Sequence, residues 1–158
     1  MAIDPALWSE LQATFQEDIR ATGQLEDVLV HERAALEHRD YKTFQALASQ
    51  KHGLLGLLER HAVARQQRLQ QAGFRYVCST LHSADEEAPQ VAQTWRELGE
   101  QWKHCQELNE VNERIAQRTR LVVNHMLDML RGRQSQGNIY TQSGGTKSTG
   151  YGQRITSA

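Results

Sequence analysis

The chain has 158 residues and a formal net charge of -1; 39% of its residues are hydrophobic and 6% are aromatic. That length predicts one domain with an appendage. The near-neutral charge disfavours a nucleic-acid binder, which would carry a basic face. The start of the chain lacks the basic and apolar regions of a secretory signal, and no apolar run approaches the ~20 residues that cross a bilayer. A soluble cytoplasmic protein is therefore expected.

A first long helix is predicted from about Pro5 to His38. Asp4 is a good N-cap, because its carboxylate can accept hydrogen bonds from the free N–H groups of the first turn. Pro5 fits the first helical position, where its missing N–H costs nothing. Apolar residues then recur at three- and four-residue steps, as on one face of a helix: Trp8, Leu11, Phe15, Ile19, Thr22, Leu25, Leu29 and Leu36.

A second long helix is predicted between Asp40, another N-cap, and Gly73, a residue typical of helix ends. Its seam becomes polar toward the end: Phe44, Leu47, Lys51, Leu54, Leu58, His61 and Arg65. Residues 4–39 contain eight acids and three bases, whereas residues 41–73 contain five bases and one acid. This complementarity predicts that the first two helices face each other; a basic docking surface is the alternative interpretation.

Residues 74–82 are predicted to form a short extra helix or turn, and a third long helix from about Glu87 to Arg131 follows. Its seam is Leu98, Trp102, Cys105, Asn109, Asn112, Ile115, Thr119, Val122, Met126 and Met129. Long amphipathic helices joined by short connections pack as antiparallel bundles. Residues 1–131 are therefore predicted to be an all-α antiparallel bundle of three long helices with a short extra helix.

Residues 132–158 contain no acid and are dense in Gly, Ser, Thr and Gln. Such a segment has too little apolar surface to fold alone but can order on a partner, so a flexible partner-binding tail is predicted. Ile139 and Tyr140 form an isolated apolar pair within it. Tyrosine offers a large contact area with few rotamers to freeze, which suits an anchor in a partner's pocket; folding back onto the bundle is the alternative.

No arrangement of residues indicates catalysis, a metal site or a cofactor. None of the seven histidines follows a carboxylate by three residues, as the helical di-iron sites require, and phosphate-loop and hydrolase motifs are absent. Cys78 and Cys105 are read as reduced thiols. A phosphotransfer bundle using His52 and a structural or adaptor coiled coil are the alternative functions. The seam drifts from strict seven-residue repeats, which favours a monomer over a weak dimer.

Two features of the third helix indicate partner binding. Its end is crowded with more apolar side chains than a three-helix seam needs, and exposed apolar patches usually mark interaction sites: Val122, Val123, Met126, Leu127, Met129 and Leu130. Asn109 and Asn112 interrupt the seam further upstream. They are interpreted either as a structural polar layer or as a contact for a partner.

Three stretches together resemble the FlgN-type flagellar export chaperones of bacterial type III secretion. They are KHGLLGLLE on the second helix, NEVN at residues 109–112, and IYTQSG at the start of the tail. The resemblance implies a cytosolic chaperone, working without ATP or metal, that keeps hook-associated proteins unassembled and delivers them to the export gate. It also implies that the end of the third helix and the tail contact the client, and that Tyr140 contributes to docking on the gate.

Overall fold

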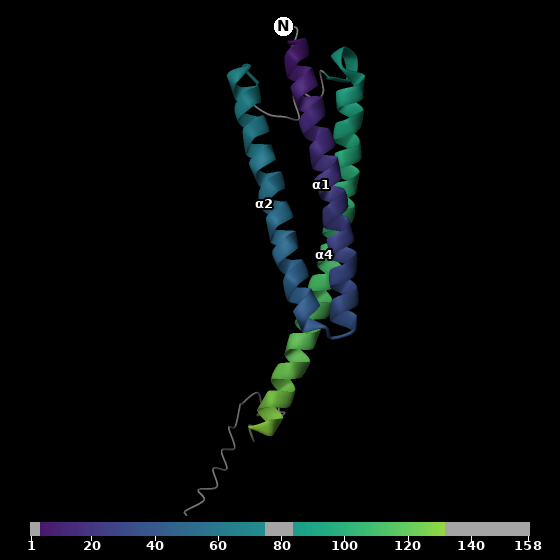
Figure 1. The fold of residues 1–158 in the computed structure, drawn as a ribbon, viewed down its shortest axis with the longest axis vertical. Coiled ribbons are helices and arrows are strands. Elements are labelled where there is room, and N and C mark those ends of the chain that lie inside the picture. The colour runs from purple at the N-terminus through teal and green to yellow at the C-terminus, as the bar shows by residue number, and fades with distance from the viewer. Residues whose placement is uncertain (1–3, 75–83, 132–158) are drawn as a thin grey trace, which may run out of the picture. The chain divides into compact units, whose positions relative to one another are not determined.

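The computed structural model describes residues 4–74 and 84–131, and these residues are helical with no strand. Helix α1 spans Pro5–Glu37, α2 spans Tyr41–Gln71 and α4 spans Pro89–Leu130 (Figure 1). Residues 84–87 add one helical turn before α4. The all-α prediction is thus confirmed for the described chain, and the three long helices begin and end within two residues of their predicted bounds. The predicted extra helix or turn over 74–82 lies almost entirely outside the described residues.

Local signals set the helix ends. The Asp4 carboxylate accepts a hydrogen bond from the Ala6 N–H at 2.9 Å, and Asp40 accepts from the Thr43 N–H at 3.1 Å and from its hydroxyl at 2.7 Å. These bonds satisfy N–H groups that have no partner within the helix. The Thr43 hydroxyl and N–H stabilise the charged carboxylate and so lower the pKa of Asp40. Gly73, with φ of 88°, terminates α2 in the left-handed conformation that glycine adopts at no steric cost.

Helices α1 and α2 run in opposite directions. Residue numbers rise along α1 as they fall along α2 in the ion pairs between them: Glu10–Arg68, Asp18–Arg65 and Glu32–Lys51. Each pair joins an acid of α1 to a base of α2, which confirms the predicted charge complementarity. By contrast, α4 runs in the same direction as α1, since Gln12 bonds Thr94 and the Leu29 carbonyl bonds Asn112.

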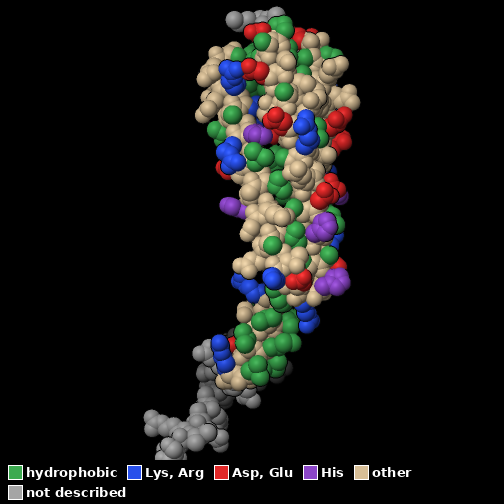
Figure 2. All heavy atoms as spheres, in the orientation of Figure 1, with side chains coloured by type: hydrophobic (Ala, Val, Ile, Leu, Met, Phe, Trp, Pro, Cys, Tyr) green, Lys and Arg blue, Asp and Glu red, His purple; other side chains and the backbone are tan. Residues whose placement is uncertain are grey.

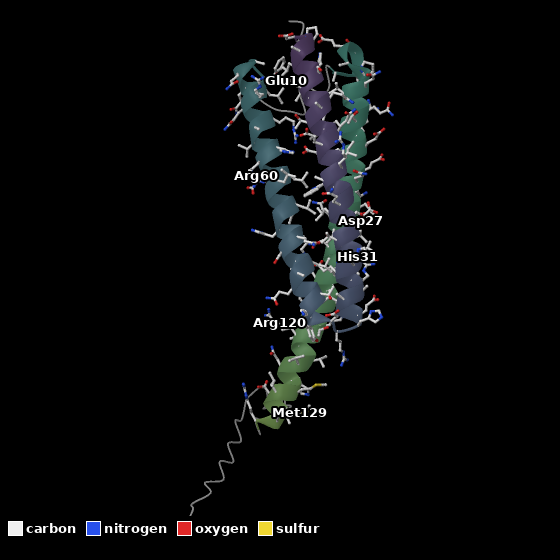
Figure 3. The ribbon with its side chains drawn as sticks, in the orientation of Figure 1. Glu10, Asp27, His31, Arg60, Arg120 and Met129 are labelled. Atoms are coloured by element: carbon white, nitrogen blue, oxygen red, sulfur yellow. The ribbon has the colours of Figure 1, made fainter. Side chains whose placement is uncertain are left out.

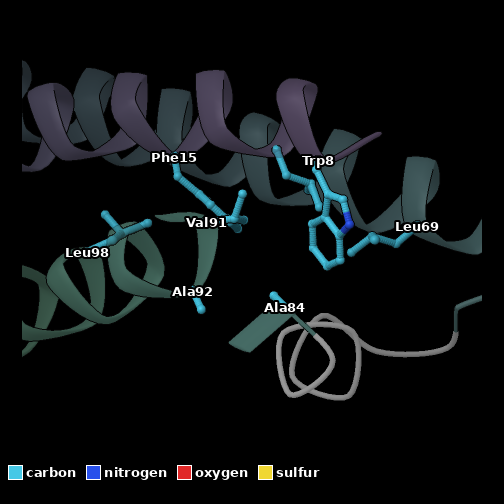
Figure 4. Packing of buried hydrophobic residues seen from close by; sticks show 8 residues of the cluster. Trp8, Phe15, Leu69, Ala84, Val91, Ala92 and Leu98 are labelled. Carbon is cyan, nitrogen blue, oxygen red and sulfur yellow. The ribbon is translucent and has the colours of Figure 1, made fainter. Parts of the chain in front are cut away.

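One hydrophobic core lies near the start of α1, where it meets the end of α2 and the start of α4. Phe15 and Leu69 are fully buried there, and the remaining buried members come from α1, from residue 84 and from α4: Trp8, Leu11, Ala84, Val91, Ala92 and Leu98 (Figure 4). A second cluster further along consists of Leu25, Leu29 and Cys105, with Leu54, Leu58 and Leu108 packed against it. Burial raises the pKa of the Cys105 thiol, consistent with the predicted reduced, core-like cysteine.

The chain divides into two units, residues 1–117 and residues 118–158. The first contains α1, α2 and most of α4, and the second contains the last residues of α4. No helix in the described part of the chain has a stretch that is both long enough and apolar enough to cross a membrane.

Candidate functional site

The interior of residues 4–117 is built in layers that recur every seven residues on each helix. One layer combines Asp18, Arg65 and Leu98, the next Leu25, Leu58 and Cys105, and the third Glu32, Lys51 and Asn112. Apart from partly exposed Leu58 and Lys51, these residues are buried. A seven-residue step returns a helix to nearly the same face, so each helix contributes one residue to each layer.

The third layer is a hydrogen-bonded polar network centred on Glu32, which is 1% exposed. Its two carboxylate oxygens accept hydrogen bonds from Lys51 Nζ at 2.7 Å and from Asn112 Nδ2 at 2.9 Å. Asn112 Nδ2 also donates to the Leu29 carbonyl at 2.8 Å, and Asn112 Oδ1 accepts from Arg33 Nε at 3.1 Å. A buried carboxylate is tolerated because its oxygens are both paired.

The two asparagines of the NEVN stretch have different surroundings. Asn112 is 2% exposed and uses both its amide oxygen and its nitrogen within the helical body. Asn109 is only partly buried, and its oxygen accepts one hydrogen bond from Lys51 Nζ at 3.2 Å. This geometry supports the polar-layer interpretation for Asn112, whereas Asn109 keeps an accessible side.

The first layer holds a second buried carboxylate. Asp18 Oδ2 accepts a hydrogen bond from Arg65 at 2.6 Å, and His61 Nδ1 lies 2.7 Å from Asp18 Oδ1. The Arg65 guanidinium also lies over the rings of Phe15 and Trp95, 4.9 and 5.9 Å from their centroids. Cation–π contact adds to the ion pair, because the ring faces are negative. The buried Asp18–Arg65 pair thus joins α1 to α2 beside the aromatic core.

Asp18 and Glu32 were not identified by the sequence analysis, although Lys51, His61 and Arg65 were placed on the seam. The signal that finds them is the seven-residue step: Asp18, Leu25 and Glu32 share one face of α1, as Lys51, Leu58 and Arg65 share one face of α2. The interpretation that the seam drifts is therefore incorrect for these central layers. A search for apolar residues at three- and four-residue steps misses acids that lie on the same helix face.

The apolar residues at the end of α4 are exposed. For the six predicted partner-binding residues at the end of α4, the exposed fraction is smallest for Leu127, at 40%, and largest for Leu130, at 84%. The other four lie between these values: Val122, Val123, Met126 and Met129. Leu121, which the prediction omitted, is 69% exposed. Hydrophobic side chains cover much of the visible surface of this segment (Figure 2), and Met129 lies near its end (Figure 3). The described structure thus leaves the apolar side chains of residues 121–130 exposed.

Ile139 and Tyr140, the two predicted tail residues, lie outside the described residues. The described histidines form no site with other ligands, since no group of three or more His, Cys, Asp or Glu side chains in the described ranges is placed to hold a metal ion. His31, for example, is exposed and directs its Nδ1 to the Asp27 carbonyl at 2.7 Å (Figure 3). That contact is a local one within α1.

Comparison with known proteins gives one family. No curated protein and no solved structure matches the chain. The model of the family described as FlgN protein matches residues 1–148, which cover all three described helices and the stretch that contains Tyr140. This is a family of chaperones and not of enzymes. Because this match covers well over half of the chain, the chain belongs to the FlgN family of flagellar export chaperones.

Proposed function

We propose that the protein is a cytosolic chaperone that binds hook-associated flagellar proteins, keeps them unassembled and delivers them to the type III export gate. The observation that carries the proposal is the exposed apolar stretch at the end of α4, together with membership of the FlgN family. A chaperone needs an apolar surface that is open until its client arrives. Residues 121–130 offer such a surface, and none of their side chains belongs to the hydrophobic clusters of residues 4–117.

The energetics of that stretch suit reversible binding. Burying a Leu, Met or Val side chain completely stabilises a complex by about 1.5–3 kcal/mol, and the exposed side chains of this stretch provide several such contacts. Freezing side chains and losing translational freedom offsets much of this gain. Methionine adds adaptability because it is unbranched and has three rotatable bonds. Met126 and Met129, 52% and 60% exposed, allow one surface to fit related clients.

The test is a charge placed within the exposed stretch. Leu127→Asp should abolish co-purification of the hook-associated client, because a carboxylate would lose its water in the interface. Helical content should stay unchanged, since Leu127 is exposed. Val63→Asp on α2 is the matched control, because Val63 is also exposed, at 52%. If Leu127→Asp retains the client as well as the Val63 variant does, this stretch is not the client-binding surface.

Delivery is proposed to depend on Tyr140, which would anchor the tail on the cytoplasmic platform of the gate. Tyr140→Ala should keep client binding, because it leaves the exposed apolar stretch unaltered, and should impair secretion of the client. Tyr151→Ala and deletion of Gly144–Ala158 are the controls and should do less damage. Normal secretion by the Tyr140→Ala variant would refute the docking role and leave the client-binding proposal standing.

A further inference from the structure

The charge of the chain is divided unequally between its two units. Residues 1–117 contain twelve bases and eighteen acids, a net side-chain charge of -6, whereas residues 118–158 contain six bases and one acid, a net charge of +5. The near-neutral total therefore conceals a basic unit that begins at Arg118. Its described part, residues 118–131, is the same stretch that carries the exposed apolar side chains at the end of α4.

The side chains of this stretch are sorted by kind around the helix. At 3.6 residues per turn, six apolar side chains occupy an arc of roughly 160°: Val122, Val123, Met126, Leu127, Met129 and Leu130. Arg118 lies at one edge of this apolar arc, and Arg120 and Arg131 lie at the other (Arg120 and Met129 are labelled in Figure 3). The opposite side of the helix holds Asn124, His125 and Asp128, with one apolar residue, Leu121.

The three arginines are available to a partner. Arg118, Arg120 and Arg131 are exposed, and no ion pair joins any of them to an acid within residues 4–74 and 84–131. By contrast, Arg65 and Arg68 of α2 pair with acids of α1. The positive charge beside the apolar arc is thus not neutralised by the described residues, and it favours a partner that is negatively charged as well as apolar.

The sign of this charge disfavours two occupants that the chain itself could supply. A second copy would bring a net charge of +5 against an equal one, and residues 132–158 contain three bases and no acid; like charges repel at short distance. A nucleic acid is disfavoured for another reason. Single strands are held by aromatic side chains that stack on bases, whereas residues 118–131 contain no aromatic residue and separate their arginines by an aliphatic surface.

The width of the apolar arc favours a bilayer surface over one partner helix. The seam that a helix presents to a single partner helix is narrower than the stripe that faces a core, whereas a helix that lies in a membrane interface buries nearly half of its circumference. Arginines at both edges of the arc suit that position, because their apolar stems can follow the hydrocarbon while the guanidinium groups bind lipid phosphates. This distribution is typical of helices that lie in the plane of the membrane surface.

We propose that residues 118–131 bind the surface of bilayers that contain anionic phospholipids, with the apolar arc in the interface and the three arginines at the phosphates. The inference goes beyond client binding, and its test needs no client. If the proposed function also holds, a bilayer and a client compete for the same apolar side chains. Contact with a membrane would then favour release of the client.

The test is sedimentation of the full-length protein with vesicles of phosphatidylglycerol and phosphatidylcholine in equal parts, or of phosphatidylcholine alone. We expect binding to the first kind only, and weaker binding as salt screens the charges. The combined changes Arg118→Gln, Arg120→Gln and Arg131→Gln should weaken it at least ten-fold, because each arginine near an anionic surface contributes roughly five-fold. Circular dichroism should show unchanged helical content, since the three side chains are exposed.

The matched control removes the same charge from residues 1–117. Arg20, Arg60 and Lys103 are exposed, and their combined replacement by Gln should leave vesicle binding within two-fold of wild type. A second measurement locates the apolar arc. Lipids brominated in their acyl chains should quench the additional fluorescence of Met126→Trp, in the middle of the arc, and not that of Asn124→Trp, outside it.

Several outcomes would overturn the inference and leave the client-binding proposal standing. They are absence of wild-type binding to the phosphatidylglycerol vesicles, equal binding to phosphatidylcholine alone, retained binding in the triple arginine variant, and equal quenching at positions 124 and 126. Binding of single-stranded RNA but not of vesicles would assign the arginines to a nucleic acid instead. A wild-type dimer that dissociates in Leu127→Asp, measured by light scattering, would show that a second copy covers the arc. Conversely, vesicle binding by a protein that retains no client would refute the proposed function alone.

Discussion

Replacing Asn112 is expected to destabilise the protein far more than replacing Asn109, although the two residues stand three positions apart on α4. In Asn112→Ala, Glu32 Oε2 loses its 2.9 Å hydrogen bond while the carboxylate stays buried with only Lys51 beside it. Arg33 loses its 3.1 Å hydrogen bond to the amide oxygen. In Asn109→Ala, only one 3.2 Å hydrogen bond from Lys51 is removed, and Lys51 keeps its ion pair with Glu32.

The size of each effect depends on whether water can replace the missing hydrogen bond. A buried charged acceptor left without one donor costs about 1.5–3 kcal/mol, whereas Arg33 is partly exposed and can recover a water molecule for about 0.5 kcal/mol. The Leu29 carbonyl loses a second donor, which costs less. The expected destabilisation for Asn112→Ala is therefore about 2–3 kcal/mol. For Asn109→Ala it is under about 1 kcal/mol, because the side chain is only partly buried and water can replace it.

The assay is urea unfolding of both variants, followed by circular dichroism at pH 7 and fitted with a common slope. Asn112→Asp supplies a sharper comparison: it keeps the shape of the side chain but replaces the donor to Glu32 with a second carboxylate. It should destabilise at least as much as Asn112→Ala. Equal destabilisation by Asn109→Ala and Asn112→Ala, or a value below about 1 kcal/mol for the latter, would refute the claim that Glu32 depends on Asn112.

Further predictions concern the core and the cap of α2. Leu69→Ala should destabilise by about 3 kcal/mol, because Leu69 is fully buried, whereas Val63→Ala, at an exposed site, should stay within about 0.5 kcal/mol; equal midpoints in thermal unfolding would contradict this. The lowered pKa of Asp40 means that its carboxylate stabilises the fold fully above the unfolded pKa of about 3.9 and loses that effect as pH falls through the folded pKa. The Tm difference between wild type and Asp40→Asn should be constant from pH 7 to about 5 and change below about pH 4, and a difference that stays constant down to pH 2 would exclude a titrating cap.

Helix positions were predictable from the sequence because their signals are local. The carboxylates of Asp4 and Asp40 bond N–H groups two and three residues away, and Gly73 supplies a positive φ that stops α2. These effects act over one turn of chain. The complementary charge of the first two helices was also predictable from the sequence. A net charge sums over many residues, so it does not depend on knowing which acid pairs with which base. The family resemblance came from three short stretches, which lie on the second helix, on the third helix and in the tail.

Pairing of the buried polar residues was decided only by the tertiary structure. Asp18 and Glu32 look like solvated acids when α1 is read alone, and their burial follows from Arg65, Lys51 and Asn112 reaching the same layers from other helices. Periodicity tells which face a residue shares but not which residue of another helix will oppose it. That choice depends on the relative alignment of the helices along their axes.

The pocket of about 410 Å³ that is lined by Leu58 of α2 and by Gly99 and Trp102 of α4 shows the same division. The sequence places Trp102 and Leu58 on apolar seams and marks Gly99 as a position without a side chain. Whether those seams close on each other or leave space depends on the distance between the helices, which is set by all the side chains packed between them. Asn109 and Asn112 are the simplest case. The sequence presents two equal asparagines, and only the approach of α1 buries Asn112 while Asn109 stays partly exposed.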